Sequence, residues 1–128
     1  MGEAPAGSPV RSERIGDTAV VYAGDYLNKL SGERIERACR EHLRAGCRAL
    51  VVDFTETALV NSIGVSILLG VIDAVEREHA RLVFAGASGQ AAQLFQLLGL
   101  TRHVALAPDR RAALELLAES TNAGASNH

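Results

Sequence analysis

The chain has 128 residues, of which 48% are apolar and 22% are charged, and its formal net charge is −2. This length fits one globular domain with a sizeable core, and no apolar run reaches the length of a membrane span. The formal net charge gives no reason to expect nucleic acid or an anionic membrane as the main partner. We therefore expect no nucleic-acid partner and no membrane insertion.

Both ends of the chain are rich in small and polar residues. Residues 1–9 lack the basic start and apolar core of a secretory signal, so we expect a flexible tail on a cytoplasmic protein. Residues 120–128 are expected to form a disordered tail, which leaves residues 10–119 as the single domain. Cys39 and Cys47 form neither a disulfide framework nor a CxxC zinc motif, so reduced thiols and no metal site are expected.

The first part of the chain predicts a hairpin followed by a helix. Val10–Ile15 is a weak strand, and Thr18–Ala23 is a β-rich run after the turn signal Gly16-Asp17. The helix is expected to open with Ser31 as its N-cap and to end at Gly46.

The middle of the chain predicts a buried strand and a long helix. The apolar run Ala49–Val52, within Cys47–Phe54, is typical of a central strand that is buried on both faces. The helix should begin at Ser62 or Ile63 and end near His79. Its buried stripe is expected to contain Val65, Leu68, Leu69, Ile72 and Val75.

The last part predicts two further strands, Arg81–Ala85 and His103–Ala107. Ser88 is expected to cap a helix that runs to Leu98, and Asp109 a final helix. In that final helix the residues expected to pack inward are Leu114, Leu116 and Leu117. The order ββαβαβαβα predicts an α/β fold: a small mixed or parallel sheet of about four to five strands, flanked by about four helices.

No group of residues has the pattern of a catalytic centre, and no cofactor motif is present. Asp53 and Glu56 are a possible carboxylate pair, although a turn at the end of a strand explains them better. The segment Gly86–Gly89 has two glycines and no lysine, which favours a tight loop with an N-cap over a phosphate-binding turn. The histidines are isolated in the sequence: His42, His79, His103 and His128.

Asn61 and Ser62 directly precede the apolar face of the long helix. Both are residue types that cap helix N-termini. The free N–H groups and the dipole of a helix N-terminus favour negative charge, so a hydroxyl at Ser62 can carry a phosphate without unfolding its own domain. Residue spacing alone favours a structural cap at Ser62 over a phosphorylation site.

The sequence VNSIGVSILLG at Val60–Gly70 resembles the anti-sigma factor antagonists, which carry the STAS domain. The similarity extends from about Val10 to about Ala118. It includes the turn at Gly24, the strand Leu50–Phe54, and the Leu98-Gly99-Leu100 segment. The resemblance implies a STAS-like domain, a small sheet with helices on one side.

The resemblance also implies a function without enzymatic activity. The protein would bind an anti-sigma factor that is a serine kinase and thereby release a sigma factor. That kinase would phosphorylate Ser62, and a metal-dependent Ser/Thr phosphatase would reverse the modification. The protein would be a monomer or a dimer. The residues implied at the partner surface are Asp25, Asn61, Ser62, Ile63, Gly64 and Ser66.

The chain departs from the usual family pattern at several positions. Asn61 and Leu27 stand where acidic residues are common, Ser66 replaces the second glycine, and Ile63 replaces a small residue. Two other functions therefore stay open at this point. One is a scaffold subunit of a larger signalling assembly, and the other is an accessory STAS subunit of a lipid-transport ABC complex.

Overall fold

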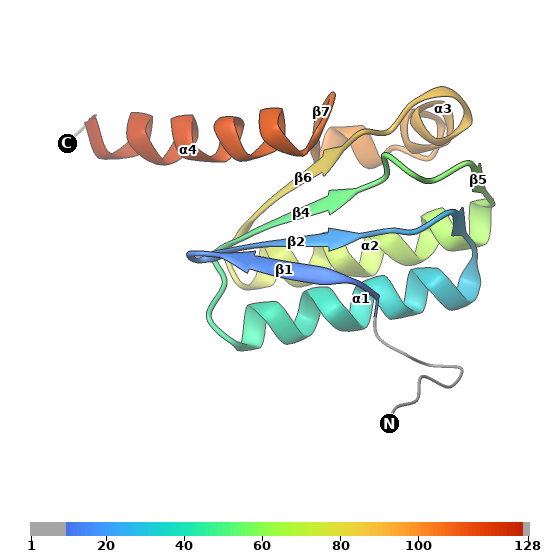
Figure 1. Ribbon diagram of the computed structural model, residues 1–128, viewed down its shortest axis with the longest axis horizontal. Helices are drawn as coiled ribbons and strands as arrows, with labels where there is room; N and C mark the ends of the chain where they lie inside the picture. Colours follow the sequence, from blue (N-terminus) through green and yellow to red (C-terminus); the bar gives the residue numbers. More distant parts are fainter. Residues whose placement is uncertain (1–9, 127–128) are drawn as a thin grey trace.

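The computed structural model describes residues 10–126 as a twisted five-stranded sheet between helices (Figure 1). The strand order is β1-β2-β4-β6-β7. The elements are β1 (Ser12–Ile15), β2 (Thr18–Tyr22), β4 (Ala49–Asp53), β6 (Arg81–Ala85) and β7 (Ala105–Ala107). β1 and β2 pair antiparallel, and the other neighbours pair in parallel. The predicted α/β fold, hairpin and central strand are therefore confirmed, and the tail expected at residues 1–9 lies outside the described residues.

One face of the sheet carries the larger part of the core. It is covered by α1 (Lys29–Arg44) and α2 (Ser62–Arg77), and α3 (Gly89–Leu97) closes one end of this layer. Phe54, Phe84 and Phe95 pack edge to face or tilted, with ring centroids 4.9–5.2 Å apart. Such aromatic contacts add to the stabilisation that comes from burial alone. No helix within residues 10–126 is long and apolar enough to span a membrane.

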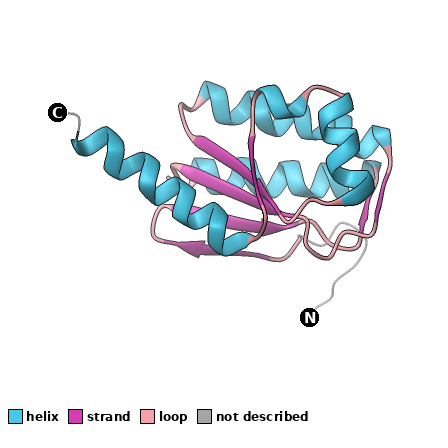
Figure 2. Cartoon of the chain, turned by 90° about the horizontal axis from the view of Figure 1, so that it is seen from above, coloured by secondary structure: helices cyan, strands magenta, loops and turns pink. Residues whose placement is uncertain are grey.

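The other face is covered by α4 (Arg110–Ser126), which crosses the strands and projects beyond them (Figure 2). Its buried Ala113 and Leu117 pack on Val20, Val51 and Val83. The resemblance implied helices on one side of the sheet, so the position of α4 is a correction.

The cap expected for α4 is confirmed, because Asp109 Oδ1 accepts from the backbone N–H of Ala112 at 2.8 Å. The helix continues to Ser126, although the sequence predicted disorder from residue 120. Each residue added to an established helix gains a backbone hydrogen bond, and this favours continuation through weak helix formers.

Two expected N-caps differ in the structure. Asn28, not Ser31, caps α1: Ser31 occupies the third helical position, and the two side chains bond each other's backbone in a capping box. Ser88 stands at the cap position of α3 but its side chain makes no capping hydrogen bond. The buried stripe of α2 includes Val71, while Leu69 is 45% exposed. This correction follows from the contact with α1, which fixes the rotation of α2 about its axis.

Three short elements were not expected from the sequence. β3 (Tyr26–Leu27) and β5 (Leu59–Val60) form a separate parallel two-stranded sheet, and Leu100–Arg102 forms one turn of 3₁₀ helix. That turn explains why β7 starts at Ala105 and not at His103. The β3–β5 pair joins the loops that precede α1 and α2, so it determines where the start of α2 lies.

Candidate functional site

The start of α2 is built by Asn61, whose backbone is extended (φ −121°, ψ 162°). Asn61 Oδ1 accepts from the backbone N–H of Gly64 at 2.8 Å, and Asn61 O accepts from Val65 at 3.1 Å. These bonds satisfy the third and fourth N–H groups of the helix end. The sequence alone favoured a cap at Ser62, but the structure gives this role to Asn61. Ser62 is the first helical residue.

Ser62 is exposed, and its hydroxyl has no hydrogen-bond partner within residues 10–126. Ser66 lies one turn further along the same side of α2 and is also exposed. Its hydroxyl donates to the backbone carbonyl of Ser62 at 2.8 Å. The two serines therefore differ: the Ser66 hydroxyl is bound to the helix backbone, whereas the Ser62 hydroxyl is available to a reagent or a partner.

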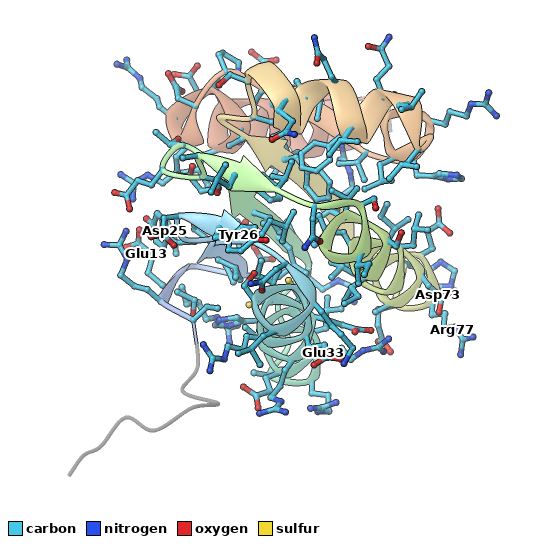
Figure 3. The ribbon with its side chains drawn as sticks, turned by 90° about the vertical axis from the view of Figure 1, so that its right-hand side faces the viewer. Glu13, Asp25, Tyr26, Glu33, Asp73 and Arg77 are labelled. Atoms are coloured by element: carbon cyan, nitrogen blue, oxygen red, sulfur yellow. The ribbon has the colours of Figure 1, made fainter. Side chains whose placement is uncertain are left out.

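The turn at Asp25 is fixed against the loop that leads to Ser62. Gly24 has φ +88°, a conformation that favours glycine, and its carbonyl accepts from Thr57 Oγ1 at 2.6 Å. The carbonyl of Asp25 accepts from the backbone N–H of Ala58 at 2.9 Å. These bonds bring Asp25 to the end of the molecule that carries the start of α2, as the sequence analysis expected (Figure 3).

Gly64 is buried where α2 meets the turn between β3 and α1. A Cβ atom at this position would lie 2.8 Å from the carbonyl oxygen of Leu27 and 2.9 Å from the backbone of Asn28. Only glycine therefore allows the helix to approach this closely. Gly64 supports the site through packing and does not present a side chain to a partner.

Exposed apolar side chains lie near Ser62, and of these the sequence analysis named Ile63 but missed Tyr26 and Leu59. Tyr26 and Leu59 are partners in the β3–β5 pair and are 42% and 59% exposed, while Ile63, directly after Ser62, is 57% exposed. Tyr26 also accepts a long hydrogen bond (3.5 Å) from Asn61 Nδ2. We call Tyr26, Leu59 and Ile63 the apolar rim. The run Ala58-Leu59-Val60 was the sequence signal, but two-residue strands are too short for an alternation pattern to show.

The site has no partner groups for catalysis among the described residues. No cluster of His, Cys, Asp or Glu in residues 10–126 can hold a metal ion. Burial raises the pKa of the Cys39 thiol to about 12, so this sulfur stays protonated and is a poor nucleophile. The arrangement around Ser62 is that of an exposed hydroxyl beside exposed apolar side chains.

Asn61 and Ser88 both stand at helix N-cap positions, but only Asn61 makes a capping hydrogen bond with its side chain. Substitutions at the two positions therefore test this assignment. Asn61→Ala is expected to lower the free energy of unfolding by about 1 kcal/mol, because the Gly64 N–H loses its acceptor. Asn61→Asp keeps an acceptor and should stay close to the parent. Ser88→Ala should change little, since the Ser88 side chain caps nothing. Urea unfolding of the three variants checks this, and equal losses in Asn61→Ala and Ser88→Ala would contradict the assignment.

Comparison with solved structures identifies the same fold in several proteins. An anti-sigma factor antagonist from Mycobacterium paratuberculosis is 22% identical with a TM-score of 0.72, covering 89% of this chain and 97% of that one. An RsbS variant from Moorella thermoacetica is 19% identical with a TM-score of 0.77, covering 88% and 97%. The Bacillus cell fate determinant SpoIIAA in its phosphorylated form is 19% identical with a TM-score of 0.65, covering 83% and 97%.

At these identities the likeness shows a shared fold. No curated protein matches the sequence. The sequence pattern of the STAS domain matches residues 10–113, which is most of the chain. The matched residues contain all five strands of the main sheet and helices α1, α2 and α3. The chain therefore belongs to the STAS-domain family.

Proposed function

We propose that the protein is an anti-sigma factor antagonist whose binding to an anti-sigma serine kinase is switched by phosphorylation of Ser62. The observation that carries this proposal is the exposed Ser62 hydroxyl, which has no hydrogen-bond partner in residues 10–126 and adjoins the apolar rim. An exposed apolar surface can bind a partner protein. A phosphate added to a hydroxyl next to that surface would place a charge in the interface and weaken the binding. Asp25 and Ser66 complete the proposed interface.

The physical basis of the switch is a difference between the free and bound states. In the free protein, a phosphate at the start of α2 lies near the positive end of the helix dipole, which is favourable by up to about 1 kcal/mol. The Asn61 cap is neutral, so it does not repel this phosphate. In a complex, the same phosphate would lose its water against a surface shaped for a neutral hydroxyl. Phosphorylation therefore weakens the complex and leaves the fold intact.

In this proposal the protein itself is not an enzyme. The kinase supplies the phosphoryl group, a metal-dependent Ser/Thr phosphatase removes it, and both act on the antagonist in the cytoplasm. Within residues 10–126 the Ser62 hydroxyl is hydrogen-bonded to no basic side chain, so in this proposal the kinase supplies the base that activates it. The consequence of binding is release of the sigma factor that the kinase holds.

The test is intact-mass analysis with site mapping on protein purified from its own organism, before and after phosphatase treatment. We expect one phosphoryl group on Ser62 that phosphatase removes. Absence of phosphate across growth phases and stresses would reject the switch. Phosphate on Ser66 alone would also reject it, because that hydroxyl is already bonded to the Ser62 carbonyl.

A second candidate function is a subunit of a larger assembly built from STAS domains. The fold is shared with a chain in the stressosome, described as a signal integration and transduction hub, at a TM-score of 0.67 and 19% identity. Sedimentation of the purified protein distinguishes the two functions. A mass far above that of a monomer or dimer favours the assembly, and a small species favours the separate antagonist.

A further inference from the structure

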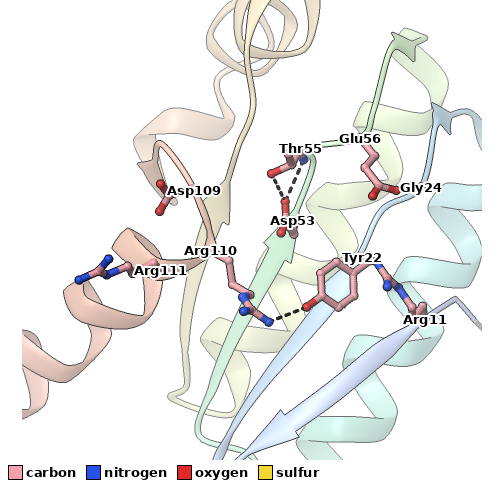
Figure 4. Close-up of a pocket in the computed structure, with 9 residues that line it drawn as sticks. All are labelled: Arg11, Tyr22, Gly24, Asp53, Thr55, Glu56, Asp109, Arg110 and Arg111. Carbon is pink, nitrogen blue, oxygen red and sulfur yellow. Dashed lines mark hydrogen bonds between the residues drawn. The ribbon is translucent and has the colours of Figure 1, made fainter.

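A second polar site lies on the α4 face of the sheet, apart from Ser62. It is a hollow of about 300 Å³ at the carboxyl ends of β2 and β4, beneath the first turn of α4 (Figure 4). The volume is at the lower end of the range for small-molecule sites. The residues that line it are Arg11, Tyr22, Gly24, Asp53, Thr55, Glu56, Asp109, Arg110 and Arg111.

The register of the sheet places Tyr22 and Asp53 side by side in the lining of this hollow. One row across the strands pairs Tyr22 with Asp53, Asp53 with Ala85, and Ala85 with Ala107. The two alanines are buried against α4 and do not line the hollow, so in this row only Tyr22 and Asp53 face the open volume.

Asp53 is the only polar or charged side chain that is buried among residues 10–119, with 9% of its surface exposed. Asp53 Oδ1 accepts from the Thr55 backbone N–H at 2.8 Å and from Thr55 Oγ1 at 2.6 Å. Asp53 Oδ2 has no hydrogen-bond partner within residues 10–126. This oxygen is accessible from the hollow, so it can accept a hydrogen bond or form an ion pair with a bound molecule.

The opposite wall carries Arg110, which is ion-paired with Glu13. Arg110 Nη1 donates to the hydroxyl of Tyr22 at 3.0 Å and to Glu13 Oε2. The other guanidinium nitrogens of Arg110 have no partner within residues 10–126. Tyr22 thus stands between the two walls, beside Asp53 in the sheet and bonded to Arg110 through its hydroxyl. Its ring is fixed by Arg11, whose guanidinium carbon lies 4.1 Å from the ring centroid.

The charges of the lining select the class of ligand. Three arginines and three carboxylates balance, so neither a simple anion nor a simple cation is favoured everywhere in the hollow. An anion alone would lie beside the Asp53 carboxylate, and a cation alone would lie beside Arg110. A molecule that carries both a positive and a negative charge can pair with Asp53 and with Arg110 at the same time. We propose that this hollow binds a small zwitterion, an α-amino acid, with its ammonium on Asp53 and its carboxylate on Arg110.

The test is a thermal-shift screen of the full chain against the natural L-amino acids at millimolar concentration, followed by calorimetric titration of those that stabilise it. We expect at least one to bind. Its analogues that lack the amino group or the carboxylate should each bind at least tenfold more weakly, about 1.4 kcal/mol. Absence of binding by every amino acid, or equal binding of either analogue, would overturn the proposal.

Substitutions of the lining residues test whether the amino acid binds in this hollow. Asp53→Asn keeps the acceptor for Thr55 and replaces Oδ2 with a donor, so we expect at least tenfold weaker binding. Arg110→Gln should weaken binding similarly and serves if Asp53→Asn does not fold. Asp73→Asn, which removes an exposed carboxylate paired with Arg77 on α2, is the matched control and should bind as the parent does. Unchanged affinity in the folded hollow variants would also overturn the proposal.

Discussion

Ser62→Asp is expected to abolish binding to the anti-sigma kinase, whereas Ser62→Ala is expected to bind as well as the parent. The carboxylate places a charge at the first residue of α2, next to the apolar rim. In the complex that charge would lose its water without a partner, and this penalty falls on the bound state alone. We expect an affinity loss of about 100-fold, or about 2.7 kcal/mol. Calorimetric titration against the purified kinase measures it.

Ser88→Asp is the matched control for this experiment. Ser88 is also an exposed serine at a helix N-terminus, and its side chain makes no capping bond. It therefore receives the same charge in a similar helix setting outside the proposed interface. We expect Ser88→Asp to keep full affinity. Equal binding by Ser62→Ala and Ser62→Asp would exclude Ser62 as the switch, and equal losses in Ser62→Asp and Ser88→Asp would point to net charge instead.

Gly64→Ala is expected to lower the free energy of unfolding by about 1 to 2 kcal/mol. The new methyl group would lie 2.8–2.9 Å from backbone atoms of Leu27 and Asn28, which cannot rotate away as a side chain can. Overpacking of this kind costs about 1–3 kcal/mol and sometimes more. It exceeds the gain of about 1 kcal/mol from replacing glycine by alanine in a helix. Urea unfolding monitored by circular dichroism measures the difference.

Gly70→Ala provides the control within the same helix. A Cβ atom at Gly70 would meet only the carboxylate end of Glu36, a flexible and partly exposed side chain that can move. The helix-propensity gain should then offset the weakened Glu36–Arg40 pair, so we expect stability within about 1 kcal/mol of the parent. Comparable losses in the two variants would mean that close approach to the β3–α1 turn is not what requires glycine at position 64.

The main strands and helices could be read from the sequence because each has a local signal. The apolar run Ala49–Val52 predicted a strand that proves to be buried throughout. Arg81–Ala85 was predicted with its correct ends, and α2 with its correct start. Ser62 was placed at a helix N-terminus by the same local pattern. In these segments hydrophobic periodicity and capping preference agree with the tertiary structure.

The sequence by itself determined the α/β order and the position of Ser62, since both depend on neighbours in the chain. Only the tertiary structure decided which side chains surround Ser62. β3 and β5 have two residues each and exist because they pair with one another, which no local pattern records. The same holds for the hollow at Asp53, whose walls come from β2, β4 and α4. Contacts between residues far apart in the sequence depend on how whole strands and helices pack together. Patterns among neighbouring residues do not contain this information, so these contacts could not be predicted from the sequence.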